Sequence, residues 1–367
     1  MRAAFVDHPA FDAPAWRNMH PLAFSRHAAL LALCRAQGWL DGPEVVPTFL
    51  PERATLLRLH DANYVDALER AIESGKVTAH DRIRHGFGTM ANPIFPGLFD
   101  RARATVGGAI TAAQVALGGR IAFHPAGGTH HGRGDRASGF CYFNDPAFAI
   151  LTLLDAGAAP VLYLDLDAHH GDGVEHLLAD DPRVQLVSIH EEGRWPHSGT
   201  SATPGPANAI NIAVPRALND TELDWLMTEV VAEIAQGVRP AAVVVTAGAD
   251  CLHGDPLSAM ELSNRAFWGA VECATRWAPH AVVLGGGGYN PWTVSRGWAG
   301  LWAVLSGRDP SAPPTGPARK LLAGYESDLI EEDEVDPEWL RSIADAPRPG
   351  AIRPEIRLLG AAALGRL

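Results

Sequence analysis

The sequence predicts an α/β fold with a mostly parallel central sheet and helices on both of its faces. Short segments rich in Val, Leu and Ile alternate along the chain with longer segments of helical periodicity. Such alternation is typical of βαβ units, and continuous apolar strands indicate a sheet that is covered on both faces. Four of the predicted strands run directly into polar or Gly-rich loops, which is where α/β sheets place their functional sites.

Each element follows from its local pattern. The strands are short apolar, often β-branched runs, expected at 3–6, 121–124, 161–164, 184–189, 241–246 and 281–284, with a strand or turn at 57–60. The helices have apolar residues at a period near 3.6, expected at 28–39, between 60 and 72, at 101–117, 147–156, from 174 to 178, and at 221–236, 258–277 and 291–306. Residues 80–97 contain Gly and Pro without periodicity, and we expect a long loop there.

Composition limits the class of protein and its compartment. The net charge of −12 argues against a general nucleic-acid binder. Four cysteines without a CxxC pair indicate a reduced, cytoplasmic protein, and no apolar run is long enough to predict a membrane helix. Residues 1–306 carry the alternating pattern and are expected to form the catalytic domain. The Pro-rich and acidic residues 307–367 are expected to be an extension that packs on that domain or forms a homo-oligomer contact.

The densest group of ionisable side chains follows the predicted strand 161–164, between Asp165 and Asp172. Asp167 and His169 are two residues apart, so their side chains point the same way in an extended segment. A carboxylate and an imidazole on one side of the chain are the beginning of a divalent metal site.

Such a site needs a third protein ligand. Asp255 is the expected one, because it lies at the exit of the strand 241–246 between a glycine and a proline. Asp250 and His253 are the alternatives in the same loop. Two carboxylates and one neutral imidazole, with one position left for water, suit a catalytic rather than a structural zinc ion.

Five motifs in order resemble the histone deacetylase family: GGTHH with GFCYFND, then DLDAHHGDGVE, SIH, GADCLHGDP and GGGGY. The similarity spans roughly residues 18–305 and extends to bacterial acetoin-utilisation deacetylases and acetylpolyamine amidohydrolases. It implies a three-layer arginase–deacetylase fold. It also implies zinc-dependent removal of an acetyl or other small acyl group from an amine such as acetyl-lysine or an acetylpolyamine. The implied cofactors are one catalytic Zn²⁺, with Fe²⁺ as the alternative in the cell, and a structural K⁺.

The resemblance also implies roles for single residues. The metal ligands are Asp167, His169 and Asp255. The other catalytic residues are the tandem histidines, the carboxylates that orient them and a tyrosine facing the substrate carbonyl: His130, His131, Asp165, Asp172 and Tyr289. His131 is expected to be the main general base and His130 an acid or electrostatic group. The acyl-chain tunnel is assigned to Gly139, Phe140, Trp195 and, near its mouth, Leu262. The K⁺ site is assigned to Asp165, Asp167, His169, Ser188 and Ile189.

One position departs from the family pattern. Relatives that act on proteins carry an aspartate at the rim, where this chain has Ala91 before Asn92. A histone-like peptide substrate is therefore in doubt. Glu191 and Glu192 are expected near the rim, where carboxylates would favour a cationic amine.

Two other functions share parts of this pattern. One is a catalytically silent module that binds acyl amines, and the other is an arginase-like binuclear manganese ureohydrolase. The tandem histidines and Tyr289 favour the deacetylase over both. His20 and Arg26 match a family segment that lines an inner cavity below the metal.

Overall fold

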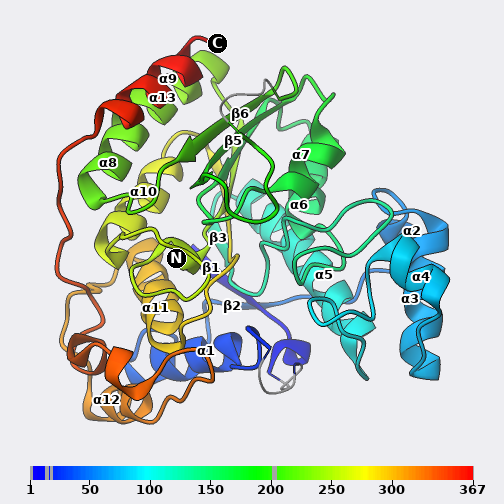
Figure 1. Cartoon of the computed structure of the whole chain (residues 1–367), viewed down its shortest axis with the longest axis horizontal. Coiled ribbons are helices and arrows are strands. Elements are labelled where there is room, and N and C mark those ends of the chain that lie inside the picture. The colour runs from blue at the N-terminus through cyan, green and yellow to red at the C-terminus, as the bar shows by residue number, and fades with distance from the viewer. Residues whose placement is uncertain (1–2, 13–15, 17–19, 201–204, 367) are drawn as a thin grey trace.

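The structure, a computed structural model, describes residues 3–12, 16, 20–200 and 205–366. Its centre is one eight-stranded sheet in the order β2-β1-β3-β8-β7-β4-β5-β6, and all neighbouring strands are parallel (Figure 1). The strands are β1 Ala3–Asp7, β2 Val45–Pro47, β3 Ile121–His124, β4 Val161–Asp165, β5 Val184–Glu191, β6 Ala209–Val214, β7 Ala242–Thr246 and β8 His280–Leu284. The predicted α/β class with a parallel sheet is confirmed.

Helices connect the strands and cover the sheet. The first seven are α1 Arg26–Ala36, α2 Arg53–Leu56, α3 Ala62–Ser74, α4 Ala79–His85, α5 Leu98–Leu117, α6 Asp145–Asp155 and α7 Asp172–Leu178. The others are α8 Asp220–Trp225, α9 Ala232–Val238, α10 Asn264–Ala274, α11 Pro291–Ser306, α12 Gly316–Ala323 and α13 Pro354–Leu364. A π-helical segment, Leu226–Val231, joins α8 to α9.

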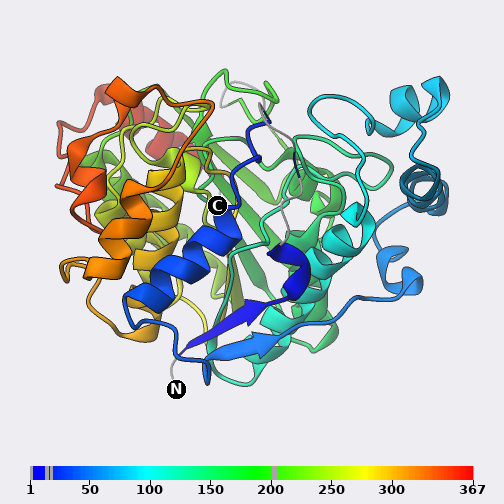
Figure 2. The ribbon, with the colours of Figure 1, turned by 90° about the horizontal axis from the view of Figure 1, so that it is seen from below.

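The sheet is buried on both faces, which explains its continuous apolar strands. In β4, Leu162 and Leu164 belong to one core with residues of α1, α10 and α11, whereas Val161 and Tyr163 belong to a second core with residues of α5 and α6. Both views show helices on the two sides of the sheet (Figures 1 and 2). Alternate side chains of each strand therefore bury against different helical layers, giving the predicted three-layer arrangement.

Several predicted elements differ from the observed ones. The expected loop 80–97 begins with α4, whose Thr78 cap accepts a hydrogen bond from Asp81 N–H (3.0 Å), whereas the segment 57–60, predicted as a strand or turn, does form turns. The predicted helix 258–277 starts only at residue 264, because the Ser263 side chain caps it there. Strands β2 and β6 were not predicted, although β6 has a readable apolar pattern, AINIAV.

The C-terminal segment packs against the body of the molecule. Ala318 and Leu322 of α12 and Ile356 of α13 are buried in the core that also contains α1 and α11. Arg353 forms two hydrogen bonds of 2.6 and 2.7 Å with the fully buried carboxylate of Glu222. Within the described residues, no helix has the length and apolarity needed to cross a membrane.

Candidate active site

The metal-ligand candidates Asp167 and His169 lie on the turn that follows β4. Both are buried, and Asp167 Oδ1 accepts a hydrogen bond from the backbone N–H of His169 (2.9 Å). The other carboxylate oxygen of Asp167 accepts one from Gly287 N–H (2.6 Å), in the glycine-rich loop after β8. The carboxyl ends of β4 and β8 therefore meet at one edge of the sheet, as expected for a parallel α/β fold.

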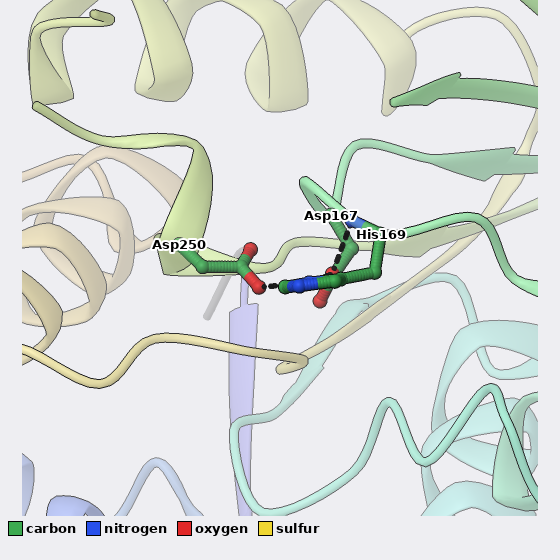
Figure 3. A group of neighbouring side chains, drawn as sticks. All are labelled: Asp167, His169 and Asp250. Carbon is green, nitrogen blue, oxygen red and sulfur yellow. Dashed lines mark hydrogen bonds and ion pairs between the residues drawn. The ribbon is translucent and has the colours of Figure 1, made fainter. Parts of the chain in front are cut away.

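Asp250 completes a compact group with these two residues. Asp167, His169 and Asp250 each offer a ligand-type atom within 4.8 Å of the others, and Figure 3 shows Asp250 reaching the imidazole of His169. The expected third ligand, Asp255, is not in this group, whereas Asp250 was its alternative. Both Asp250 oxygens are engaged, one with His169 Nδ1 (2.9 Å) and one with Ala168 N–H (3.0 Å).

Asp255 lies farther along the same loop. Its oxygens accept hydrogen bonds from Leu257 N–H (2.9 Å) and Tyr289 N–H (2.7 Å). Its residue surface is 6 % exposed, whereas Asp250 is completely buried. Asp255 is thus hydrogen-bonded to the loop that carries Tyr289, whereas Asp250 is hydrogen-bonded to Nδ1 of the His169 ring.

The charges of this cluster fit a metal ion. Burial raises the pKa of Asp250, and the adjacent charge of Asp167 raises it further. Burial and the charge of Asp250 together raise the pKa of Asp255. For His169, burial lowers the pKa, but its bonds to Asp167 and Asp250 outweigh this and raise the pKa to about 10. The buried carboxylates repel one another, and their charges favour a proton on the neighbouring imidazole. A divalent cation bound among these groups would offset that repulsion.

The tandem histidines face this cluster, and each is held by a buried carboxylate. His130 Nδ1 lies 2.7 Å from Asp165 Oδ2, and His131 Nδ1 lies 2.7 Å from Asp172 Oδ1. Their ring centroids are 4.0 Å apart. A carboxylate on Nδ1 fixes the tautomer and leaves Nε2 of each ring for chemistry.

The two histidines differ in protonation. Burial lowers the pKa of His130, but Asp165 and Asp167 outweigh it and raise the pKa to about 9. Burial and the charge of His130 lower the pKa of His131 to about 3. His131 also lines the large pocket described below. The neutral, pocket-facing ring is therefore His131, which is the arrangement a general base requires.

Two residues without an assigned role from the sequence fix the histidine loop. The Asn144 side chain donates to the carbonyls of His130 (3.2 Å) and Gly132 (2.8 Å). Asp145 accepts from the N–H groups of Gly128 (3.0 Å) and Thr129 (2.7 Å). The sequence does contain a signal for these two residues, because Asn144 and Asp145 end the motif GFCYFND that follows the histidines.

Tyr289 enters the pocket from the loop after β8. Its ring centroid lies 6.5 Å from that of His169 and 5.9 Å from that of Phe140. Burial and the nearby carboxylates raise its pKa well above the ordinary value, so its hydroxyl remains a hydrogen-bond donor. Arg26 supports the loop by donating to the carbonyls of Gly286 (2.8 Å) and Gly288 (3.2 Å).

A second cavity, of about 90 Å³, lies beside the site and is lined by Arg26 and Phe140. Arg26 therefore occupies the inner position expected for it. His20 does not line this cavity; its ring packs against Phe140 with centroids 4.9 Å apart.

The large pocket has a volume of about 1100 Å³, and Gly139, Phe140 and Trp195 line it together with His131 and His169. Gly139 is required here. Its φ is +52°, and a Cβ atom would lie 2.5 Å from both His131 and Trp195. Leu262, which was expected near the tunnel mouth, is buried in the main core, and the described pocket lining includes Leu257 but not Leu262.

The rim differs from the expected acidic one. Glu191 lines the pocket but is only 3 % exposed, and its carboxylate binds Arg194 (2.6 Å) and Ala259 N–H (2.7 Å). Glu192 is exposed, and Ala91 also lines the pocket. The expectation that both glutamates attract a cationic amine is wrong for Glu191, because its charge is already paired.

The residues assigned to a monovalent cation lie behind the metal cluster. Ser188 pairs with Asp165 across β4 and β5, and its hydroxyl is 2.8 Å from His190 Nδ1. Asp165 and Ser188 line a space of about 10 Å³. Ile189 is buried next to Ser188. The K⁺ assignment stays a prediction.

The fold and these side chains together define a deacetylase-type hydrolase. The model of the histone deacetylase domain matches residues 20–305, and the chain belongs to the histone deacetylase family. The resemblance drawn from the motifs is thereby confirmed.

Individual relatives agree with this assignment. The acetoin utilization protein AcuC of Bacillus subtilis (strain 168) is 32% identical over 327 residues, covering 84% of this chain and 83% of AcuC. Histone deacetylase 8 of Xenopus tropicalis is 31% identical, covering 84% of this chain and 85% of that protein. The crystal structure of an HDAC homolog from Aquifex aeolicus matches with a TM-score of 0.92 and 31% identity, covering 99% of this chain and 100% of that one. A structure of an HDAC homolog complexed with SAHA matches with the same TM-score, 30% identity and the same coverage.

Proposed function

We propose that this protein is a zinc-dependent amidohydrolase that removes an acetyl or other small acyl group from an amine such as acetyl-lysine. The observation that carries the proposal is one pocket whose walls include His131, His169 and Tyr289. A candidate general base (His131), a candidate metal ligand (His169) and a hydroxyl that can donate to a carbonyl oxygen (Tyr289) thus line one pocket, as amide hydrolysis requires. The SAHA complex of the HDAC homolog, with its TM-score of 0.92, supports small-molecule binding in this fold.

The proposed zinc ligands are Asp167, His169 and Asp255. Asp250 is proposed as the partner of His169 Nδ1, because its Oδ2 lies 2.9 Å from this nitrogen. A metal-binding imidazole commonly donates a hydrogen bond from its second ring nitrogen to a carboxylate, which fixes the tautomer and orientation of the ring. When bound, zinc would polarise the amide carbonyl and make the attacking water more acidic. The proposed K⁺ site would form around Asp165 and Ser188, which pair across β4 and β5.

The chain's own residues then move the protons. His131, neutral and held by Asp172, takes a proton from the attacking water at Nε2. The Tyr289 hydroxyl donates to the carbonyl oxygen as negative charge develops there. Protonation of the leaving nitrogen is necessary because an amine anion is a very poor leaving group, and the histidine pair supplies that proton. Phe140 and Trp195 exclude water from the acyl chain.

The test is hydrolysis of a fluorogenic acetyl-lysine amide by the purified protein. We expect acetate release that a chelator abolishes and that stoichiometric zinc restores, with urea absent when arginine is supplied. The His131→Ala variant should retain zinc and lose at least ~10²-fold in rate. Chelator-insensitive hydrolysis would contradict the metal dependence. Binding of acetyl-lysine without turnover by the zinc-loaded protein would instead indicate a silent module.

A further inference from the structure

The large pocket that contains the proposed site is lined by an unusual number of arginines. Among the residues that the structure describes, five arginines line it, namely Arg82, Arg133, Arg136, Arg194 and Arg216. Three carboxylates line it as well: Asp172, Glu191 and Glu192. The described lining residues therefore have a surplus of two positive charges, in a chain whose net charge is −12.

Two of the arginines are neutralised by buried partners. Arg133 Nη2 lies 2.6 Å from Asp172, and Arg194 Nη2 lies 2.6 Å from Glu191. These pairs also occupy two of the three carboxylates, so their charges are not available to a substrate.

The other three arginines remain open to a ligand. In the part of the chain that the structure describes, Arg82, Arg136 and Arg216 have no carboxylate oxygen within 4.0 Å. All three are exposed, whereas the catalytic side chains of the pocket are buried or half-buried, so the three lie at its outer end. Of the carboxylates in the described lining, Glu192 is the one without an ion-pair partner among the described residues.

Arg82 in α4 and Arg136 in the loop after β3 both place their guanidinium groups beside the turn at residues 86–88. The Arg82 Nε donates to the carbonyl of Gly88 (3.1 Å), and within the described residues its terminal nitrogens have no hydrogen-bond partner. The Arg136 Nε lies 3.6 Å from where a Cβ atom of Gly86 would be. Gly86 has φ +71°, so the turn between the two arginines depends on glycine. Two guanidinium groups beside one tight turn can bind a single carboxylate.

We propose that the mouth of the pocket selects acyl amines that carry a carboxylate at the far end of their chain, with Arg82 and Arg136 as its ligands. The inference rests on the proposed function and specifies its substrate class as small N-acylated amino acids rather than acylated polyamines. Ala91 lines the same pocket and adds no charge, so in the described lining the three open arginines outnumber Glu192 as charged groups without an ion-pair partner.

The test compares two substrates of equal chain length and opposite end charge. 6-Acetamidohexanoate and N-acetylcadaverine both place five methylenes after the acetamide nitrogen, and 6-acetamidohexanamide is the neutral reference. We expect kcat/KM for the carboxylate to exceed that for the ammonium by about tenfold at low salt, mostly through KM. The ratio should shrink as ionic strength rises, because exposed charges are screened over about 8 Å at 0.15 M salt.

Variants identify the residues. Arg136→Glu should reverse the preference, raising kcat/KM for N-acetylcadaverine and lowering it for 6-acetamidohexanoate. Arg82→Gln should reduce the ratio toward one. Arg84→Gln is the matched control, since Arg84 is on the same helix but pairs with Asp135 (3.2 Å) and does not line the pocket. It should leave the ratio unchanged. Opposite changes for two substrates cannot arise from a loss of folding, which thermal unfolding of each variant checks separately.

The outcomes separate the two proposals. Hydrolysis of all three compounds at equal kcat/KM, or a preference for the ammonium, would overturn the carboxylate selection while the amidohydrolase remains. A peptide with aspartates beside acetyl-lysine that is cleaved more than ~10-fold faster than 6-acetamidohexanoate would assign the arginines to acidic protein segments and overturn the small-molecule class. No hydrolysis of any compound by zinc-loaded protein would refute the proposed function itself.

Discussion

Replacement of Asp172 by asparagine should lower turnover substantially without unloading the metal. Asp172 is bonded on both sides: Oδ1 to His131 Nδ1 (2.7 Å) and Oδ2 to Arg133 Nη2 (2.6 Å) and Nε (3.2 Å). Burial alone would raise its pKa, but these two partners lower it to about 2, so the wild-type group is a carboxylate at neutral pH.

An asparagine cannot satisfy both partners. If its NH₂ group faces Arg133, donors meet donors, because arginine has no acceptor. If its NH₂ group faces His131, Nδ1 must be unprotonated. The proton then resides on Nε2, and this nitrogen cannot accept one from water. Either orientation removes a charge-assisted hydrogen bond between buried groups, which contributes about 1.5–3 kcal/mol. With ~1.4 kcal/mol per tenfold, kcat should fall roughly 10- to 10²-fold.

The assay is steady-state hydrolysis of an acetyl-lysine amide, combined with zinc analysis and thermal unfolding of Asp172→Asn. Arg133→Gln is the matched comparison, since it removes a partner of Asp172 and keeps the carboxylate on His131. Because the Arg133 side chain is 37% exposed, we expect only a ~3-fold loss there. Unchanged kcat in a folded, zinc-loaded Asp172→Asn protein would refute the role of Asp172 in setting the His131 tautomer.

Three further predictions concern other parts of the molecule. Tyr289→Phe should retain zinc and KM but lose about 10²-fold in kcat, because the hydroxyl acts on charge that develops in the transition state; steady-state kinetics measures this. Metal analysis should show that Asp255→Ala loses zinc, whereas Asp250→Asn retains zinc with an affinity about 10- to 10²-fold lower than that of the unchanged protein. The opposite pattern would make Asp250 the ligand and Asp255 the partner of His169. Glu222→Gln should lower the free energy of unfolding by about 2 kcal/mol at pH 7, measured in urea, by breaking the pair with Arg353. Burial would raise the pKa of Glu222, but Arg353 lowers it below the usual value. The pair therefore stabilises the fold above the unfolded pKa of about 4.3, and this stabilisation disappears as pH falls through the lower folded value.

Much of the fold could be predicted because its strands are buried on both faces. In β4 and β7 nearly every residue is apolar, and such runs stand out in the sequence whatever their neighbours are. The short edge strand β2 could not be found this way, since its three residues are only partly buried and end in proline. It exists because Phe5 and Val6 of β1 offer it a backbone to pair with.

In the C-terminal segment, too, regular structure depends on tertiary packing more than on the local sequence pattern. The Pro-rich and acidic pattern predicts an extension packed on the domain but indicates no helix, yet α12 and α13 form there. Ala318, Leu322 and Ile356 stabilise them by burial against helices far away in the sequence. Short helices gain most of their stability from such packing, and their own sequence pattern is therefore weak.

For the site, the sequence by itself determined which groups are present. Two carboxylates and an imidazole at strand exits, tandem histidines and a tyrosine after four glycines are recognisable from residue type and spacing, because strand exits of a parallel sheet meet at one edge. Which partner each of the charged side chains contacts depends on the tertiary structure. It directs Asp250 to the imidazole nitrogen of His169, pairs Glu191 with Arg194, and brings Arg82 and Arg136 to one turn. These pairings join segments up to 81 residues apart, and they depend on distances of a few ångströms that linear spacing does not specify.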